Sequence, residues 1–372
     1  MKKIYYITAV FATLFLVGCG DGIDLPGVNV ETDLNKIPLP DNNVNLEQVE
    51  LKPSTEPMLH EGLHTEEDFQ RIRDKKAAGE EPWVSAYQLL VESQFSQKTA
   101  DTYPTEWIKR GISGDENYMN AARGATIVYQ QALRWKIEQD DEYAAKAVEN
   151  LNKWVQTCVG VTGNTNLSLA AGLYGYEFAI AGELLRDYGG WDRADFAAFQ
   201  NWLLKVFYPA NDDFLKRHHD TNALHYWANW CLCNIAAKMA IGIVTDRRDI
   251  YNEGIDHLQT GDTNGRLRRA IYHDYAPDYN FAQWQESGRD QGHTLMCVGL
   301  MGIICQLAWS QGDDFFAYDD NLFMRACEYA ACCNYTNETV PYTTYIWQKQ
   351  SQWGYPIPEE QTTLGGGKWI KR

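Results

Sequence analysis

The chain has 372 residues, of which 45% are hydrophobic, and its formal net charge is −17. Because acidic chains are poorly suited to nucleic acid, we exclude that partner. An acidic substrate remains compatible, since a local basic site can lie within an acidic shell. Residues 58–372 are long enough to bury a sizeable core, as one large domain or as two. The 13 tryptophans and 22 tyrosines suit carbohydrate binding, and they suit a well-packed helical core equally well.

The first 19 residues have the pattern of a targeting segment. Lys2 and Lys3 precede an apolar run at 7–17 that is too short to span a bilayer. The run leads into Leu16-Val17-Gly18-Cys19, which resembles a bacterial lipobox with a lipidated cysteine; an ordinary secretory signal is the alternative. We predict a lipid-anchored protein of the outer membrane, with a signal peptide at 1–19, a flexible tether at 20–57 and a domain at 58–372.

The other cysteines lie mostly in apolar stretches, and no Cys-x-x-Cys pair or histidine at zinc-ligand spacing accompanies them. We therefore expect buried free thiols, with a single disulfide as the alternative, and no metal site.

Helical periodicity recurs along the rest of the chain. We expect polar loops at 208–221 and 271–283, and helices at 65–76, 82–91, 117–138, 142–155, 167–188, 193–207, 222–242, 248–259, 292–311 and 321–335. No repeat of fixed length is present, which argues against a standard solenoid. The pattern predicts an all-α fold, an (α/α) toroid formed by an incomplete barrel of antiparallel helical hairpins.

Three polar segments are candidates for a functional site. In the first, a helix would place Asn222, His225 and Asn229 on one face. Tyr226 and Trp230 would lie on a neighbouring face as aromatic supports. The alternative is a core histidine capped by asparagines, which we consider less common on an apolar helix.

The second segment, 266–275, is rich in arginine and tyrosine. Arg268 and Arg269 are suited to an anionic group, and Tyr272 and Tyr275 supply phenols near those cations. The alternative is a solvated basic run followed by a turn.

The third segment is the most polar, Gln283-Trp284-Gln285-Glu286-Ser287-Gly288-Arg289-Asp290-Gln291-Gly292-His293, and an apolar run follows it directly. Burying so many polar groups is costly unless they pair or bind something. Glu286, Arg289 and His293 stand at i, i+3 and i+7, and Glu286 can pair with Arg289. The alternative is a Glu–Arg buttress that orients only backbone.

With these segments in view, the chain resembles the alginate-lyase-like superfamily of polysaccharide lyases over residues 60–345. It is most similar to the Bacteroides-type lipoprotein branch, whose members include alginate and glucuronan lyases. The likeness rests on 222–230, 269–276, 285–293, Glu328-Tyr329 and Asn334. The resemblance implies an (α/α) toroid that cleaves a uronic acid polymer by β-elimination without a cofactor. It also implies a further C-terminal helix. This chain ends soon after Gly365-Gly366-Gly367, so we expect that helix to be missing or the ring to stay open.

The resemblance assigns Tyr275 to the family tyrosine and Arg269 or Arg268 to its upstream arginine. The family's Asn-Asn-His-Ser-Tyr-Trp stands here as Asn222-Ala223-Leu224-His225-Tyr226-Trp227, which shifts the histidine by one position. We therefore predict His225 and Tyr275 as base and acid, with His273 and His293 as further candidates for the base. The carboxylate of the substrate would be held by Asn222, Asn229 and Arg289. The remaining substrate-binding candidates are Trp227 and Trp284 as platforms, with Tyr226, Arg269, Tyr272, Gln285 and Glu286.

The predicted function is cleavage of an anionic polysaccharide, with mannuronate-rich alginate first and glucuronan second. One alternative is a toroidal glycoside hydrolase that uses Glu286 and Asp290 as its carboxyl pair. The other alternative is a helical glycan-binding surface lipoprotein.

Overall fold

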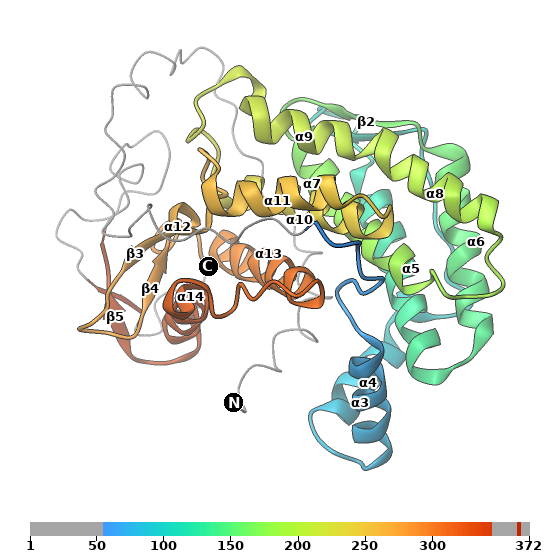
Figure 1. Cartoon of the computed structure of the whole chain (residues 1–372), viewed down its shortest axis with the longest axis horizontal. Coiled ribbons are helices and arrows are strands. Elements are labelled where there is room, and N and C mark those ends of the chain that lie inside the picture. The colour runs from blue at the N-terminus through green and yellow to red at the C-terminus, as the bar shows by residue number, and fades with distance from the viewer. Residues whose placement is uncertain (1–54, 344–362, 366–372) are drawn as a thin grey trace. The chain divides into compact units, whose positions relative to one another are not determined.

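A computed structural model describes residues 55–343 and 363–365 and divides the chain into two compact units (Figure 1). The first unit holds the described residues up to 216 together with 233–254. The second holds 217–232, the residues from 255 to 343, and 363–365. The predicted signal peptide with Cys19, nearly all of the predicted tether and the Gly366-Gly367 pair lie outside the described residues.

The first unit is built mainly of helices. Its elements are α3 (Glu66–Ala77), α4 (Trp83–Glu92), η2 (Gln94–Ser96), β1 (Trp107–Arg110), α5 (Tyr118–Glu138), α6 (Asp141–Thr157), β2 (Gly160–Gly163), α7 (Leu167–Leu184), α8 (Arg193–Val206) and α9 (Tyr208–Arg217), whose last residue lies in the second unit. The helix α5 packs against α6 and α7, and β1 pairs in parallel with β2. Because nearly every residue of α7 is buried, this helix forms the centre of the unit.

Local capping explains where several of these helices begin. Thr65 and Asp68 form the reciprocal capping box that their Thr-x-x-Asp spacing predicts. Asp140 and Asp192 accept hydrogen bonds from the first turns of α6 and α8. These caps satisfy backbone N–H groups that a helix start leaves without partners.

The second unit combines helices with short strands. Its elements are η3 (His218–Asp220), α12 (Leu267–Ala270), β3 (Ile271–Asp274), β4 (Ala282–Trp284), α13 (Gln291–Ser310), α14 (Tyr318–Tyr335), β5 (Thr339–Pro341) and β6 (Thr363–Gly365). Two further helices, α10 (Ala228–Val244) and α11 (Arg248–Thr260), contribute residues to both units. The antiparallel hairpin β3–β4 lies beside α14, and β5 packs on the same helix (Figure 1).

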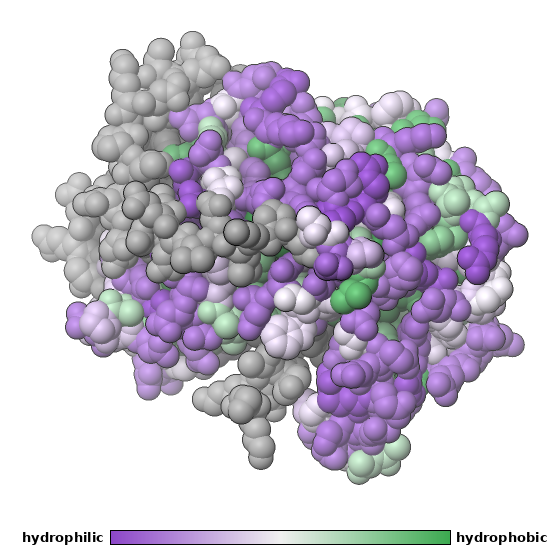
Figure 2. Space-filling view, in the orientation of Figure 1, coloured by the Kyte–Doolittle hydropathy of each residue, from purple (hydrophilic) through white to green (hydrophobic). Residues whose placement is uncertain are grey.

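Among the described residues, α13 alone is long and apolar enough to cross a membrane by length and composition. The core helix of a globular domain passes the same test, and α13 packs against α14 with most of its side chains buried. On the face drawn in Figure 2, hydrophilic residues cover most of the described surface and apolar residues are scattered. We therefore describe α13 as a core helix.

The structure corrects three of the predicted boundaries. The helix expected from residue 222 begins only at Ala228, because the Asn222 side chain accepts a hydrogen bond from the Leu224 N–H and stabilises a turn instead. The loop expected at 208–221 is largely the helix α9. The loop expected at 271–283 contains the β3–β4 hairpin.

Candidate active site

The buried amide of Gln285 ties together the three segments that the sequence singled out. Its side chain is 1% exposed. Its Oε1 accepts from the N–H of Ala228 at 3.2 Å, and its Nε2 donates to the carbonyl of Arg269 at 2.8 Å. The N-terminus of α10, the arginine segment and the polar segment therefore meet at one side chain.

Asn264 extends this connection to the turn before α10. It accepts from Gln285 Nε2 at 2.9 Å and donates to the carbonyls of Leu224 and Tyr226 at 3.1 and 2.8 Å. The turn that carries His225 is therefore fixed by a buried amide pair. No feature of the sequence pointed to Asn264, because its partners lie about forty positions before it or twenty after it.

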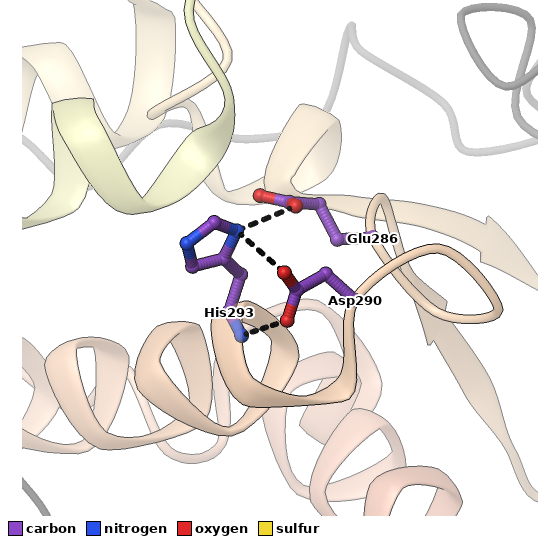
Figure 3. A group of neighbouring side chains, drawn as sticks. All are labelled: Glu286, Asp290 and His293. Carbon is purple, nitrogen blue, oxygen red and sulfur yellow. Dashed lines mark hydrogen bonds and ion pairs between the residues drawn. The ribbon is translucent and has the colours of Figure 1, made fainter. Parts of the chain in front are cut away.

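Glu286 lies at the centre of the polar segment and is 1% exposed (Figure 3). Its Oε2 accepts a hydrogen bond from the Arg289 guanidinium and lies 3.0 Å from His293 Nδ1. The Oδ2 of Asp290 lies 3.4 Å from the same Nδ1, and Asp290 also caps α13 by accepting from the His293 N–H. The predicted Glu286–Arg289 pair is confirmed, although it forms in a turn before α13 begins.

Arg289 stacks on an aromatic ring as well. Its guanidinium carbon lies 4.5 Å from the centre of the Trp227 ring, a cation–π contact. Gly288 makes the sharp turn that brings Arg289 back toward Glu286: its φ is +82°, and a Cβ there would lie 2.8 Å from the Tyr342 ring. The Arg289 side chain is partly exposed, at 19%.

A group of histidines surrounds Tyr226, which is 8% exposed. The ring centres of His225, His218 and His219 lie 4.8, 6.0 and 5.7 Å from that of Tyr226, and Trp230 lies at 4.7 Å. His225 itself is half-buried. The candidate base His225 therefore packs against the ring of Tyr226 within this aromatic cluster.

The most buried member of this cluster is His218. Burial, with the neighbouring imidazoles of His257, His219 and His225, lowers the pKa of His218 to about 4. Its Nε2 lies 3.4 Å from the Sγ of Cys231, and burial raises the pKa of that thiol to about 12. The pair is therefore neutral at pH 7.

Tyr275 lies at the hairpin, where its phenol has protein partners. The Oη donates to Gln283 Oε1 at 2.6 Å and lies 3.1 Å from Thr343 Oγ1, a partner that no sequence motif indicated. Burial raises the pKa of Tyr275 above its ordinary value, although the bonds to Thr343 oppose the shift. The phenol is therefore protonated at neutral pH, which suits an acid better than a base.

His273 packs against Tyr275, with ring centres 4.6 Å apart. Its buried Nδ1 has no hydrogen-bond partner among the described residues. Burial lowers the pKa of His273, while the adjacent Asp274 opposes this change, so the ring is neutral at pH 7. Asp274 is itself held by the Arg325 guanidinium, which sets its orientation.

Several predicted substrate-binding residues are structural instead. Trp284 is 1% exposed and its Nε1 donates to the Ala326 carbonyl, so it is a core residue and not a platform. The side chain of Gln285 forms hydrogen bonds with backbone groups and with Asn264. Tyr272 and Asn229 are 4% and 1% exposed, and Asn229 Oδ1 has no hydrogen-bond partner among the described residues.

The predicted shared face of Asn222, His225 and Asn229 does not form, because the first two lie in the turn and only Asn229 is helical. Arg269 is half-buried and donates to the Asp262 carbonyl. Its neighbour Arg268 pairs with Asp319. These two arginines therefore have protein partners within the second unit.

One group of described side chains has the composition of a metal site. The ligand atoms of Glu286, Asp290 and His293 all lie within 4.8 Å of one another (Figure 3). The guanidinium of Arg289 lies directly against Glu286, and its positive charge opposes a divalent cation there. The two carboxylates are therefore better suited to binding the side chains of Arg289 and His293 than to binding a metal ion.

Comparison with known proteins defines the class of molecule. The family model for alginate lyase matches residues 73–338, so the chain belongs to the alginate lyase family and is a polysaccharide lyase. No curated protein sequence matches the chain.

Solved structures place the fold within the same class. Alginate lyase A1-III, in a histidine-to-alanine variant complexed with tetrasaccharide, has a TM-score of 0.57 and 13% identity over 73% of this chain and 77% of that one. The same enzyme from Sphingomonas species A1 has a TM-score of 0.51 at 13% identity over 73% and 78%. An alginate lyase from Bacteroides ovatus has a TM-score of 0.51 at 14% identity over 72% and 82%. The predicted all-α, (α/α) toroid fold class is confirmed.

Proposed function

We propose that the protein cleaves a polyuronate by β-elimination and leaves an unsaturated uronate at the new non-reducing end. Mannuronate-rich alginate is the first substrate and glucuronan the second. Membership of the alginate lyase family supports this choice, as does the relative complexed with a tetrasaccharide. The observation that carries the proposal is the partly exposed side chain of Arg289, whose guanidinium is bound by Glu286 and stacked on Trp227.

β-Elimination on a uronate requires a cationic group beside the substrate carboxylate. Elimination removes the C5 proton of a uronate, and the adjacent carboxylate opposes the carbanion that forms. A fixed guanidinium stabilises the charge that develops on that carboxylate in the transition state. We assign this role to Arg289, with the half-buried amide of Asn222 as its partner and Trp227 as a platform for the sugar ring.

Two further groups transfer protons. We assign His225 as the base that removes the C5 proton and Tyr275 as the acid that protonates the leaving O4. The raised pKa of Tyr275 supports the second role, because the phenol keeps its proton at neutral pH. His273, a neutral imidazole in contact with Tyr275, is the alternative base.

The geometry disfavours the glycoside hydrolase alternative. Glu286 and Asp290 both lie against His293 Nδ1, with ligand oxygens within 4.8 Å of each other. A hydrolase places its two carboxyl groups on opposite sides of the scissile bond, about 5 to 9 Å apart. These two carboxylates share one imidazole instead, and Glu286 is too buried to reach a sugar.

A panel of polymers tests the proposal. The protein is incubated with polymannuronate, polyguluronate and glucuronan while the absorbance of new C4–C5 double bonds is followed. We expect absorbance to rise with polymannuronate first. A rise in reducing ends without that absorbance would identify a hydrolase, and no change in either would leave only glycan binding.

We also propose that the mature protein is anchored in the outer membrane by lipid on Cys19, with support from the basic residues, apolar run and lipobox-like sequence before it. Cells grown with labelled palmitate should label the wild-type protein and not a Cys19→Ser variant. Equal labelling of both would contradict this proposal.

A further inference from the structure

We propose that His293 is a second cationic group for the uronate carboxylate, held beside Arg289 by the buried carboxylate of Glu286. This inference rests on the proposed lyase function and extends it by one catalytic residue, His293, and two positioning residues, Glu286 and Asp290. The two side chains share one partner, because the Oε2 of Glu286 contacts both Arg289 and His293.

The first argument is the exposure of these groups. Glu286 is 1% exposed, so it is not placed to touch a polymer. The side chains of Arg289 and His293 are 19% and 23% exposed, so part of each is accessible although each contacts Glu286. A buried carboxylate thus contacts two partly exposed side chains, Arg289 and His293. Figure 3 draws the contact with His293.

The second argument is the protonation of the imidazole. Nδ1 of His293 faces Glu286 Oε2 at 3.0 Å and Asp290 Oδ2 at 3.4 Å. A lone pair on Nδ1 would repel both oxygens, so Nδ1 carries the proton and donates it to them. The two carboxylates therefore contact Nδ1, and Nε2 is the second ring nitrogen.

The third argument is the charge balance. With neutral His293, the two carboxylates and Arg289 sum to a net negative cluster, which repels a polyuronate. A second proton on Nε2 makes the cluster neutral and gives a donor for the sugar carboxylate. The N-terminal turn of the 20-residue helix α13, where His293 is the third residue, adds favourable potential for an anion.

The fourth argument is the rigidity of the support. Asp290 caps α13 through the His293 N–H, and Arg289 is stacked on Trp227. The two cations are therefore oriented before substrate arrives, and preorganised donors of this kind contribute most where charge develops in the transition state. Glu286 and Asp290 act through the residues that they hold.

The test compares substrates that differ only in carboxylate charge. The variants Glu286→Gln and His293→Gln are assayed by double-bond absorbance on a polyuronate and on the same polymer partly methyl-esterified. We expect kcat/KM on the free acid to fall by about 100-fold in each variant, the usual effect of losing one oriented donor. We also expect the preference of the wild type for the free acid to shrink in both.

A matched control separates positioning from folding. Glu183 and Arg186 also form a largely buried i, i+3 pair, in the first unit, with side-chain exposures of 5% and 11%. The variant Glu183→Gln should lose stability as Glu286→Gln does, while its preference for the free acid stays that of the wild type. A matching loss of preference in Glu183→Gln would overturn the proposal.

The remaining outcomes are also decisive. If His293→Gln loses turnover but keeps the full preference for the free acid, His293 acts as a base and the proposal is wrong. If a chelator abolishes wild-type activity, a divalent cation restores it and Glu286→Gln no longer binds that cation, the cluster holds a metal and the proposal is also wrong. Wild-type protein that produces no double bonds on any polyuronate would instead overturn the lyase function on which this inference rests.

Discussion

Gly288 shows how one backbone conformation can determine a site. Its φ of +82° is accessible to glycine at little cost, and the Tyr342 ring fills the space where a side chain would begin. The turn that it makes returns Arg289 to Glu286. A site whose cations are held by one buried carboxylate therefore depends on a residue that has no side chain.

We predict that Gly288→Ala lowers the free energy of unfolding by about 1–3 kcal/mol and reduces turnover, because the alanine is strained and clashes with Tyr342. Denaturant unfolding and the absorbance assay measure the two effects. Gly312→Ala is the control: its φ is +92°, but nothing lies within 4 Å of its Cβ. It should lose less stability and keep wild-type turnover; equal effects of both variants would exclude the proposed clash.

The proton-transfer assignment gives a second prediction at this scale. His225→Ala and Tyr275→Phe should each lower kcat by about 100-fold or more, the range for loss of a general base or acid. Tyr275→Phe also removes the bonds to Gln283 and Thr343, so its stability is measured in parallel. Wild-type turnover in both variants would show that other groups, such as His273, move the protons.

The buried His218 gives a pH-dependent prediction. Its pKa is lowered from 6.5 to about 4 in the folded protein, so folding favours the neutral imidazole. Its contribution to stability is complete above pH 6.5 and is lost as the pH falls toward 4, where the unfolded chain binds a proton that the folded chain does not. The full loss corresponds to about 3 kcal/mol.

Unfolding by denaturant at several pH values between 7.5 and 4.5 measures this loss. The variant His218→Gln should have a flatter dependence of unfolding free energy on pH than the wild type. Parallel curves would mean that another group, such as His64 in the first unit, causes the acid sensitivity; burial lowers the pKa of His64 to about 4 as well.

At the scale of elements, the second unit is connected by buried amides rather than by a sheet. Gln285 and Asn264 satisfy the N-terminus of α10, the turn before it and the end of α12. A buried polar network of this kind specifies one arrangement, because any partner left without a hydrogen bond is costly. The turn bearing His225 therefore has a fixed position relative to α12 and β4.

We predict that Gln285→Ala destabilises the protein by about 2–4 kcal/mol, since the Ala228 N–H and the Arg269 carbonyl would both lose their partner. Hydrogen exchange should accelerate in peptides covering 222–232. Gln70→Ala is the control, because Gln70 is exposed and its side-chain bonds, to Asp74 and Arg73, stay within its own helix. Unchanged exchange at 222–232 in Gln285→Ala would contradict a connecting role for this amide.

At the scale of the whole molecule, the relevant property is charge. The formal net charge of −17 repels a polyanionic substrate, while the proposed contacts of Arg289 are local and partly buried. Salt screens the long-range repulsion more than it screens close contacts. Added salt should therefore weaken the repulsion between the acidic surface and the substrate more than it weakens the attraction at Arg289.

We predict that KM for a polyuronate falls several-fold as ionic strength rises from about 10 mM to about 150 mM, over which the Debye length shortens from about 30 to 8 Å. Initial rates at a series of salt concentrations measure this. A neutral osmolyte at matched osmolality is the control and should leave KM unchanged. A steady rise of KM with salt would mean that local attraction dominates the whole range.

Helices were largely predictable because their signals are local. The capping box at Thr65, the apolar periodicity of α5, the apolar run of α13 and the end of α8 before Pro209 each depend on residues within a few positions of one another. The helix and loop boundaries that were predicted wrongly lie where another local structure competes with the predicted one. At Asn222 a side-chain turn replaced the expected helix, and the chain after Ile271 formed a hairpin whose partner strand begins eleven residues later.

The sequence by itself determined the fold class and the family, and it indicated the segments of the candidate site, because periodicity and motifs consist of consecutive residues. Only the tertiary structure decided which polar side chains are accessible. It placed Trp284 and Gln285 in the interior, joined Arg289 to Trp227 across more than sixty positions and brought His293 against Glu286. The physical reason is that burial and pairing depend on contacts between segments that are distant in the chain. The sequence therefore does not distinguish a polar residue that contacts substrate from one that only holds its neighbours in place.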